Sequence, residues 1–142
     1  MAKNETAIAQ VTPSNVKSIE NARYASFEPI SKEDKIKLYN AFNSPDEKIG
    51  SVINQSIDVV DVVLAHVELV NERTGEVEDA VRTILIDKEG RSFDATSSGI
   101  YNSVLTIQSV FGTLHFSPDE PLTVVVKQIK TKRGSTLTLS VI

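Results

Sequence analysis

Cysteine and tryptophan are absent from the 142-residue sequence, and aromatic residues make up only 6% of it. Without cysteine the chain has no disulfide framework, no thiolate metal site and no cysteine nucleophile, a composition typical of a reducing compartment. The apolar runs near the N-terminus are too short to predict a secretory signal or a membrane span. We therefore expect a soluble, cytoplasmic protein with no membrane partner, of the size of one domain.

Signatures of catalysis are missing as well. The two histidines do not form a metal-binding pair, because His66 lies in an apolar stretch and His115 in an expected loop. Ser97-Ser98-Gly99 precedes an expected helix, where a serine is more simply a helix cap than a nucleophile. No glycine-rich phosphate loop is present in the sequence. The sequence therefore predicts a protein without enzymatic activity, metal, cofactor or small-molecule substrate.

The formal net charge is −4, with an isoelectric point near 5.2. An acidic chain is a poor generic binder of nucleic acid, because phosphate neutralisation supplies most sequence-independent affinity. The charge is uneven, however: residues 121–142 contain four basic residues and no acid, whereas residues 68–79 contain five acids and one arginine. This segregation predicts a positive site on an acidic body, with a solvated hairpin tip as the plain alternative.

The N-terminal segment shows neither the period of a strand nor that of a helix. We interpret residues 1–30 as an extended arm that precedes a domain spanning residues 31–142. Tyr24, Phe27 and Ile30 recur at a spacing of three, and apolar side chains in a segment without its own core must dock elsewhere. They dock either on the same chain or on a neighbouring subunit. The second option would make them an oligomerisation arm.

The rest of the chain is rich in patterns that predict strands. Between the third and fourth strands, Ile100, Val104, Ile107 and Phe111 form the apolar stripe of a helix that ends at Gly112. Three strands, a helix and two strands is the order of a five-stranded OB-fold barrel, a mainly β fold that often holds oligonucleotides. The expected strands are residues 51–70, 77–87, 91–95, 122–129 and 136–141, with the helix at about 96–111.

A helix is also predicted before the barrel. Ser31 and Asp34 have the spacing of a capping box, with Asp34 in place of the usual glutamate. Pro45 disfavours helical geometry beyond Asn43. We expect this helix, residues 31–43, to cover one end of the barrel and to take no part in chemistry.

The candidate binding site is the basic hairpin between the last two strands. In OB folds this loop and the loop between the first two strands flank the ligand. Alternation puts Lys130 and Lys132 on one side of the hairpin, where ammonium groups could follow a phosphate backbone. Phe93 is either a platform for base stacking or a core residue, and Phe116 lies in an expected loop. The candidate nucleic-acid-binding residues are Lys127, Lys130, Lys132, Arg133, Arg73, Arg82, Arg91, Phe93 and Phe116.

Three runs, taken in this strand order, resemble the OB-fold single-stranded-DNA-binding proteins of Gram-positive phages and conjugative plasmids. They are Ile84-Leu-Ile-Asp-Lys-Glu-Gly90, Thr96-Ser-Ser-Gly-Ile-Tyr101 and Gln128-Ile-Lys-Thr-Lys-Arg-Gly134. The resemblance spans about residues 51–142 and implies a protein that coats DNA cooperatively. It also implies an N-terminal arm that links subunits, as is thought for a plasmid-encoded member. The sequence ends without the acidic tip of housekeeping single-strand binders, which favours coating or transfer over recruitment of repair enzymes.

We therefore predict a non-catalytic protein that binds single-stranded DNA without sequence preference and self-associates along it through the arm, in plasmid conjugation or phage replication. The competing hypothesis is a structural oligomerisation module whose basic hairpin meets an acidic partner protein. The acidic net charge and the missing tryptophan favour that hypothesis. Duplex DNA and RNA also stay open as ligands, because nothing in the sequence would recognise a 2′-hydroxyl.

Overall fold

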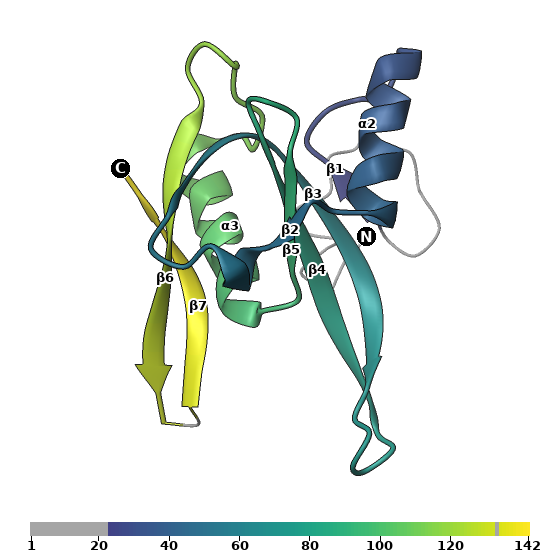
Figure 1. Cartoon of the computed structure of the whole chain (residues 1–142), viewed down its shortest axis with the longest axis vertical. Helices are drawn as coiled ribbons and strands as arrows, with labels where there is room; N and C mark the ends of the chain where they lie inside the picture. The colour runs from purple at the N-terminus through teal and green to yellow at the C-terminus, as the bar shows by residue number, and fades with distance from the viewer. Residues whose placement is uncertain (1–22, 133) are drawn as a thin grey trace.

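A single curled sheet organises the fold, with one helix against each of its faces (Figure 1). The computed structural model describes residues 23–132 and 134–142. In this part of the chain the fold is mixed α/β, with seven strands in the sheet. Neither of its helices has the length and apolar character needed to cross a membrane. The elements are β1 (Arg23–Ala25), α2 (Lys32–Asn43), β2 (Glu47–Lys48), the 3-10 turn η1 (Ile49–Ser51), β3 (Ser56–Val70), β4 (Val77–Asp87), β5 (Ser92–Ala95), α3 (Ser98–Phe111), β6 (Leu122–Thr131) and β7 (Gly134–Val141).

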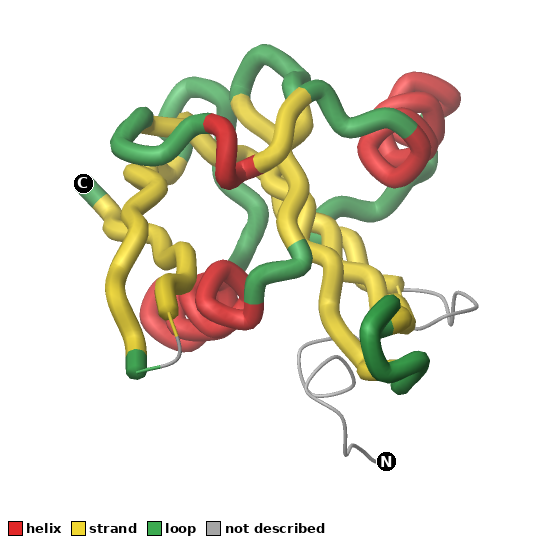
Figure 2. Tube along the Cα trace, turned by 60° about the horizontal axis from the view of Figure 1, so that its bottom comes forward, coloured by secondary structure: helices red, strands yellow, loops and turns green. Residues whose placement is uncertain are grey.

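Strand β3 is the centre of the sheet. Its sequence is rich in valine, isoleucine and leucine, residues that suit a strand buried on both faces. It pairs with β4 along most of its length, with β6 near its beginning and with β1 near its middle. The register with β4 shifts between Val59 and Asp61. Such a bulge bends a strand. The sheet as a whole is strongly curled (Figure 2).

The sheet order is β2-β5-β4-β3-β6-β7. Each of the five predicted strands is confirmed to within a few residues, whereas the short β1 and β2 had not been predicted. The pairing that would close a barrel, β5 with β7, is not among the ladders of residues 23–132 and 134–142. The sheet is therefore a curled half-barrel, and the predicted closed OB barrel is not confirmed.

Helix α3 lies along the free edge of β7. Ser103 Oγ accepts a hydrogen bond from the backbone N–H of Leu139 at 3.1 Å, and it lies 2.9 Å from the hydroxyl of Thr138. At the start of the helix, a Cβ on Gly99 would overlap the carbonyl oxygen of Leu137. A sheet edge must be paired or covered to avoid unwanted pairing. Here the helix covers the edge that β5 would need in order to close the barrel.

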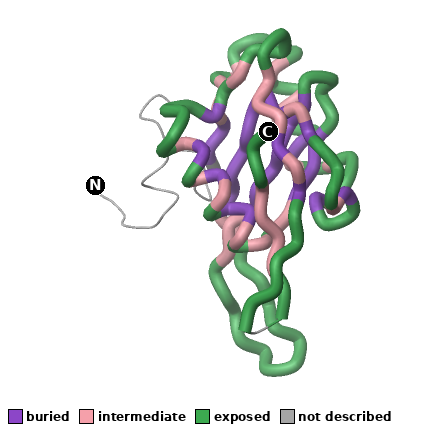
Figure 3. Tube along the Cα trace, turned by 90° about the vertical axis from the view of Figure 1, so that its left-hand side faces the viewer, coloured by how far each residue is buried: buried purple, intermediate pink, exposed green. Residues whose placement is uncertain are grey.

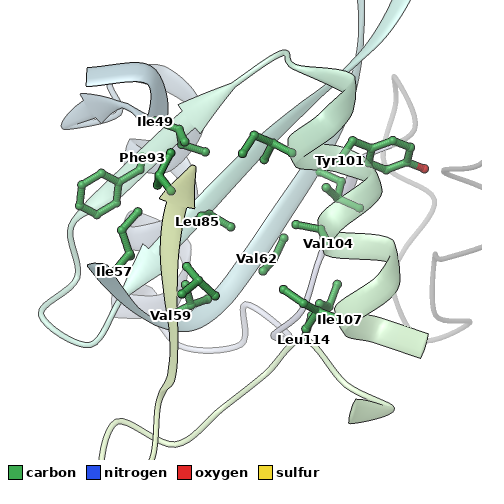
Figure 4. Close-up of a cluster of buried hydrophobic side chains, with 14 of the residues drawn as sticks. Ile49, Ile57, Val59, Val62, Leu85, Phe93, Tyr101, Val104, Ile107 and Leu114 are labelled. Carbon is green, nitrogen blue, oxygen red and sulfur yellow. The ribbon is translucent and has the colours of Figure 1, made fainter. Parts of the chain in front are cut away.

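The larger core lies between α3 and the inner face of the curl (Figure 4). Leu85 and Phe93 enter it from the sheet, and Val104 and Ile107 enter it from the helix. Burial of each such side chain contributes about 1.5–3 kcal/mol to stability. The apolar stripe predicted for the helix therefore faces the core, except that Phe111 at its end is 47% exposed.

Helix α2 packs against the opposite face of β3 and β4, and not over one end of a barrel as predicted. Its residue Ala41 lies in a second, smaller core with Ile84 of β4. The predicted cap is confirmed, because Ser31 Oγ accepts a hydrogen bond from the Asp34 N–H at 3.0 Å, and the helix ends at Asn43. In this position α2 covers the outer face of β4, which corresponds to one of the two strands on which OB folds hold their ligand.

Asp61 on β3 ties three segments to the sheet. This carboxylate is 2% exposed. Ser26 Oγ donates to Oδ1 at 2.7 Å, Lys37 Nζ of α2 donates to Oδ2 at 3.0 Å, and Nδ1 of His115, in the loop after α3, lies 2.7 Å from Oδ1. A buried charge is costly unless it is paired and hydrogen-bonded. These partners therefore hold the segment after β1, α2 and the loop together.

Both long hairpins run beyond the cores into solvent, at the same end of the molecule (Figures 1 and 3). The β3–β4 hairpin is exposed over residues 68–79, and the β6–β7 hairpin over residues 127–132 and 134–135. Gly75 and Gly134 take positive φ in the two turns, which L-residues rarely adopt. We call residues 68–79 the acidic ribbon and residues 127–135 the basic ribbon, after their charged side chains.

Candidate nucleic-acid interface

Three lysines stand on the basic ribbon without a counter-charge. Lys127, Lys130 and Lys132 are exposed, and none of them has an ion-pair partner in the described part of the chain. Residues 121–142 contain no acid that could pair with them locally. Arg133, the fourth predicted cation of the hairpin, lies outside the described residues. The ribbon is therefore a projecting strip of uncompensated positive charge.

Most of the other cations with described side chains hold the fold together. They join α2, β2 and the β4–β5 turn to the sheet through ion pairs of 2.9–3.3 Å. Besides the three lysines of the basic ribbon, Lys32, Lys35 and Arg73 have no carboxylate partner among the described residues. The pairs are Lys37–Asp61, Lys48–Asp94, Arg82–Asp94, Lys88–Asp58 and Arg91–Asp87.

Strand alternation spreads the cations over both faces of the basic ribbon. Gln128 and Lys130 lie on the side of β6 that carries the core residue Val126, and Lys127 lies on the other side. Gln128 is tied across the ribbon, because its Nε2 donates to Ser135 Oγ at 3.2 Å. A polyanion that follows the ribbon therefore meets an ammonium group on either face.

The predicted site residues Arg82 and Arg91 bind within the fold. Arg82 Nε lies 3.0 Å from Asp94 Oδ2, and its Nη1 donates to the carbonyl of Phe42 at 2.8 Å, which joins the end of α2 to β4 and β5. Arg91 Nε lies 2.9 Å from Asp87 Oδ2, and this hydrogen bond raises the pKa of Arg91 above its ordinary value. Both guanidinium groups already have carboxylate partners, and the structure does not bring them to the basic ribbon.

Arg73 lies at the turn of the acidic ribbon. Its backbone N–H donates to Asn71 Oδ1 at 2.9 Å, and its side chain is exposed between Glu72 and Glu76 in the sequence. The two hairpins that flank the ligand in an OB fold thus point to one end of this molecule (Figure 1), but only one of them is basic.

The two candidate aromatic platforms lie away from the basic ribbon. Phe93 is 3% exposed in the larger core. Phe116 is half-buried and packs edge-on against Phe111, with ring centroids 6.0 Å apart, in the loop after α3. This loop lies at the end of the molecule opposite to the ribbons (Figure 1), and residues 127–135 contain no aromatic residue. Base stacking therefore has no platform on the basic ribbon.

The three apolar anchors predicted for the arm have different surroundings. Tyr24 in β1 is 4% exposed in the larger core, where burial, and after it the charge of Asp61, raises the pKa of its hydroxyl. Phe27 packs in the smaller core, with Lys37 Nζ 4.6 Å from its ring centroid. Ile30 is 72% exposed. Two anchors thus dock on their own chain, and residues 1–22 of the predicted arm lie outside the described part.

An apolar patch on the acidic ribbon had not been predicted. Leu69, Val70 and Val77 are 41%, 63% and 58% exposed, and Val70 lies directly opposite Val77. No sequence pattern indicates such a patch, because apolar residues at the ends of strands are usually expected in a core. The patch adjoins acidic residues in the sequence, and only the three-dimensional structure shows that its ribbon projects from the same end of the molecule as the basic ribbon (Figure 1).

Residues 17–142 match the model of the Phi29-type family described as phage single-stranded DNA-binding protein. No curated protein and no solved structure matches the chain. The matched range includes both ribbons, both helices and every strand of the described sheet.

Proposed function

The chain belongs to the phage single-stranded DNA-binding protein family, a family of non-catalytic DNA-binding proteins, and from this premise we propose that it binds single-stranded DNA without sequence preference. The observation that carries the proposal is the basic ribbon, whose Lys127, Lys130 and Lys132 have no ion-pair partner within residues 23–132 and 134–142. Phosphate neutralisation releases counterions and is the main source of sequence-independent affinity. These lysines can neutralise phosphates without first breaking an internal ion pair.

The acidic body supports a binding path along the basic ribbon. With a net charge of −4, most of the surface repels a polyanion, so the field of the molecule steers DNA to its positive strip. Contacts to phosphates fix the position of the strand but carry no sequence information. Because no aromatic residue lies on the ribbon, affinity comes from charge and tolerates many sequences.

Two finer features complete the proposal. The strand order supports an OB-type ancestry, with α3 in place of the pairing that would close the barrel. Subunits assemble along the DNA, and the exposed Ile30 supports a contact of the N-terminal arm with a neighbour. The process served is plasmid conjugation or phage replication.

A pair of matched double variants tests the binding site. Lys130→Ala with Lys132→Ala removes two cations of the basic ribbon. Lys32→Ala with Lys35→Ala removes two cations of α2 that have no carboxylate partner among the described residues, so the two variants have the same net charge as each other. We expect the first variant to bind labelled oligothymidine at least about tenfold more weakly in fluorescence anisotropy at low salt, and the second to bind like the wild type. Equal effects of the two variants would show that overall charge, and not the ribbon, governs binding.

The same assay separates the ligands that share a phosphate backbone. Oligothymidine, a DNA duplex and a single-stranded RNA of equal length are compared as competitors. We expect the single-stranded DNA to compete best for the protein, because a flexible strand can follow a narrow ribbon. A duplex that competes better contradicts it.

A further inference from the structure

Exposed apolar side chains gather next to the turn of the acidic ribbon. Leu69, Val70 and Val77 are exposed there together. A two-stranded ribbon is marginally stable by itself, and clustered exposed apolar side chains mark a surface that binds another molecule.

The negative charge around this patch favours a cationic partner. Glu68 lies directly opposite Asp79 in the register, and like charges in that position destabilise a strand pair. Of the five acids of the ribbon only Asp79 has a basic neighbour in the described chain, His66 Nε2 at 3.2 Å. The other four carboxylates have no ion-pair partner within residues 23–132 and 134–142.

The basic ribbon has the complementary features. Its three described lysines lack counter-charges, and Ile129 between them is 47% exposed. Each ribbon thus combines apolar side chains with an excess of one charge, because the acidic ribbon carries five acids against Arg73 and the basic ribbon has no acid, and the two signs are opposite. We propose that the acidic ribbon binds the basic ribbon of a second copy of this chain.

The placement of the ribbons allows both contacts to form at once. They project from the same end of the molecule, the basic ribbon on the left and the acidic ribbon on the right in Figure 1. A second copy rotated by 180° about an axis perpendicular to that view, beyond the ribbon tips, sets each basic ribbon against an acidic one. The result is a closed twofold dimer with two identical contacts. The alternative orientation opposes like charges and is repelled.

The dimer would compete with DNA, because the lysines that contact the acidic ribbon are those proposed to contact phosphates. Binding of single-stranded DNA therefore dissociates the dimer into monomers. In the dimer, the acidic ribbon shields the lysines from other polyanions. This competition rests on the proposed function, whereas the dimer itself does not.

Two charge-reversal variants of the full chain test the dimer. Glu76→Lys with Glu78→Lys cancels the net charge of the acidic ribbon, and Lys130→Glu with Lys132→Glu cancels that of the basic ribbon, so that neither variant alone has two ribbons of opposite charge. By sedimentation velocity at about 0.05 M salt we expect the wild type to be a dimer that dissociates at about 0.5 M, because exposed charges are then screened. Each variant alone is expected to be a monomer. An equimolar mixture of the two is expected to form a dimer through one charged contact, between the basic ribbon of E76K/E78K and the acidic ribbon of K130E/K132E. That dimer also shows in the same experiment that both variants are folded.

Three outcomes overturn the dimer: a monomeric wild type at low salt, dimers of either variant alone, or a mixture that stays monomeric while both variants unfold cooperatively. Oligothymidine binding separates this result from the proposed function. The E76K/E78K variant is expected to lose the dimer but to keep DNA binding. If the wild type dimerises while neither it nor E76K/E78K binds oligothymidine, the proposed function fails and the dimer stands.

Discussion

At the scale of single residues, Asp58 links the two halves of the sheet. Thr123 of β6 donates its hydroxyl to Asp58 Oδ1 at 2.7 Å, and Lys88 Nζ from the β4–β5 turn lies 3.2 Å from Oδ2. The hydrogen bond from Thr123, followed by the one from Lys88, lowers the pKa of Asp58 below its ordinary value of 3.8. A carboxyl whose pKa is lower in the folded than in the unfolded state stabilises the fold above its unfolded pKa. That stabilisation is lost as the pH falls through the folded pKa.

The variant Asp58→Asn tests this pH dependence. At pH 7 we expect it to lower the free energy of unfolding by no more than about 1 kcal/mol, since the site is partly exposed and asparagine can still accept the hydrogen bond from Thr123. At about pH 2 the difference should be smaller, because the wild-type carboxyl loses its charge as the pH falls through its folded pKa. Urea unfolding at the two pH values measures it, with Asp119→Asn in an exposed loop as the control. A difference that is equal at both pH values would contradict the assignment.

At the scale of elements, the contact of α3 with β7 depends on a glycine. A Cβ on Gly99 would overlap the Leu137 carbonyl oxygen and lie 2.7 Å from Thr136 Oγ1. We expect Gly99→Ala to lower the free energy of unfolding by about 1–3 kcal/mol, as overpacking does. The matched control is Gly50→Ala, whose Cβ would meet Leu137 Cδ1 at an ordinary 3.8 Å. Urea unfolding compares them, and equal stabilities would show that α3 can shift away from the edge at no cost.

The elements also show what could be predicted from the sequence and why the rest could not. Strand β4 and helix α3 were predicted well because their signals are local: turn glycines, an apolar period and a capping serine. The position of α2 was wrong because an amphipathic pattern shows that one face is buried, but not which surface covers it. Strands β1 and β2 are short and owe their conformation to partners distant in the sequence, β3 and β5. Such partners leave no local pattern.

The site residues that were predicted correctly are also those whose surroundings are set by residues nearby in the sequence. The hairpin lysines were predicted to form a positive site because no acid lies near them in the sequence. Arg82 looked equally available, but its partner Asp94 lies on the adjacent strand. Phe93 lies in a four-residue strand, too short for alternation to show which face points inward. Pairing across strands, which no local pattern reveals, thus separated the structural cations from the free ones.

At the scale of the whole molecule, segregated charge matters more than net charge. The sequence contains more acids than bases, yet the fold places an uncompensated basic ribbon and an uncompensated acidic ribbon at one end (Figure 1). A net charge of −4 would predict weak DNA binding if the charge were evenly spread. The arrangement instead permits local attraction to DNA within a generally repulsive field. Its strength should depend strongly on salt.

The salt dependence of oligothymidine binding tests this arrangement quantitatively. Each phosphate neutralised on a single strand contributes about −0.7 to the slope of log K against log salt, so three or four cations give about −2 to −3. Between about 0.05 M and 0.2 M salt the affinity should therefore fall about 20- to 50-fold. Lys130→Ala with Lys132→Ala should make the slope shallower by about 1.4, while Lys32→Ala with Lys35→Ala should leave it unchanged. A slope near zero would exclude phosphate contacts as the source of affinity, and a slope well beyond −3 would require cations besides those of the basic ribbon.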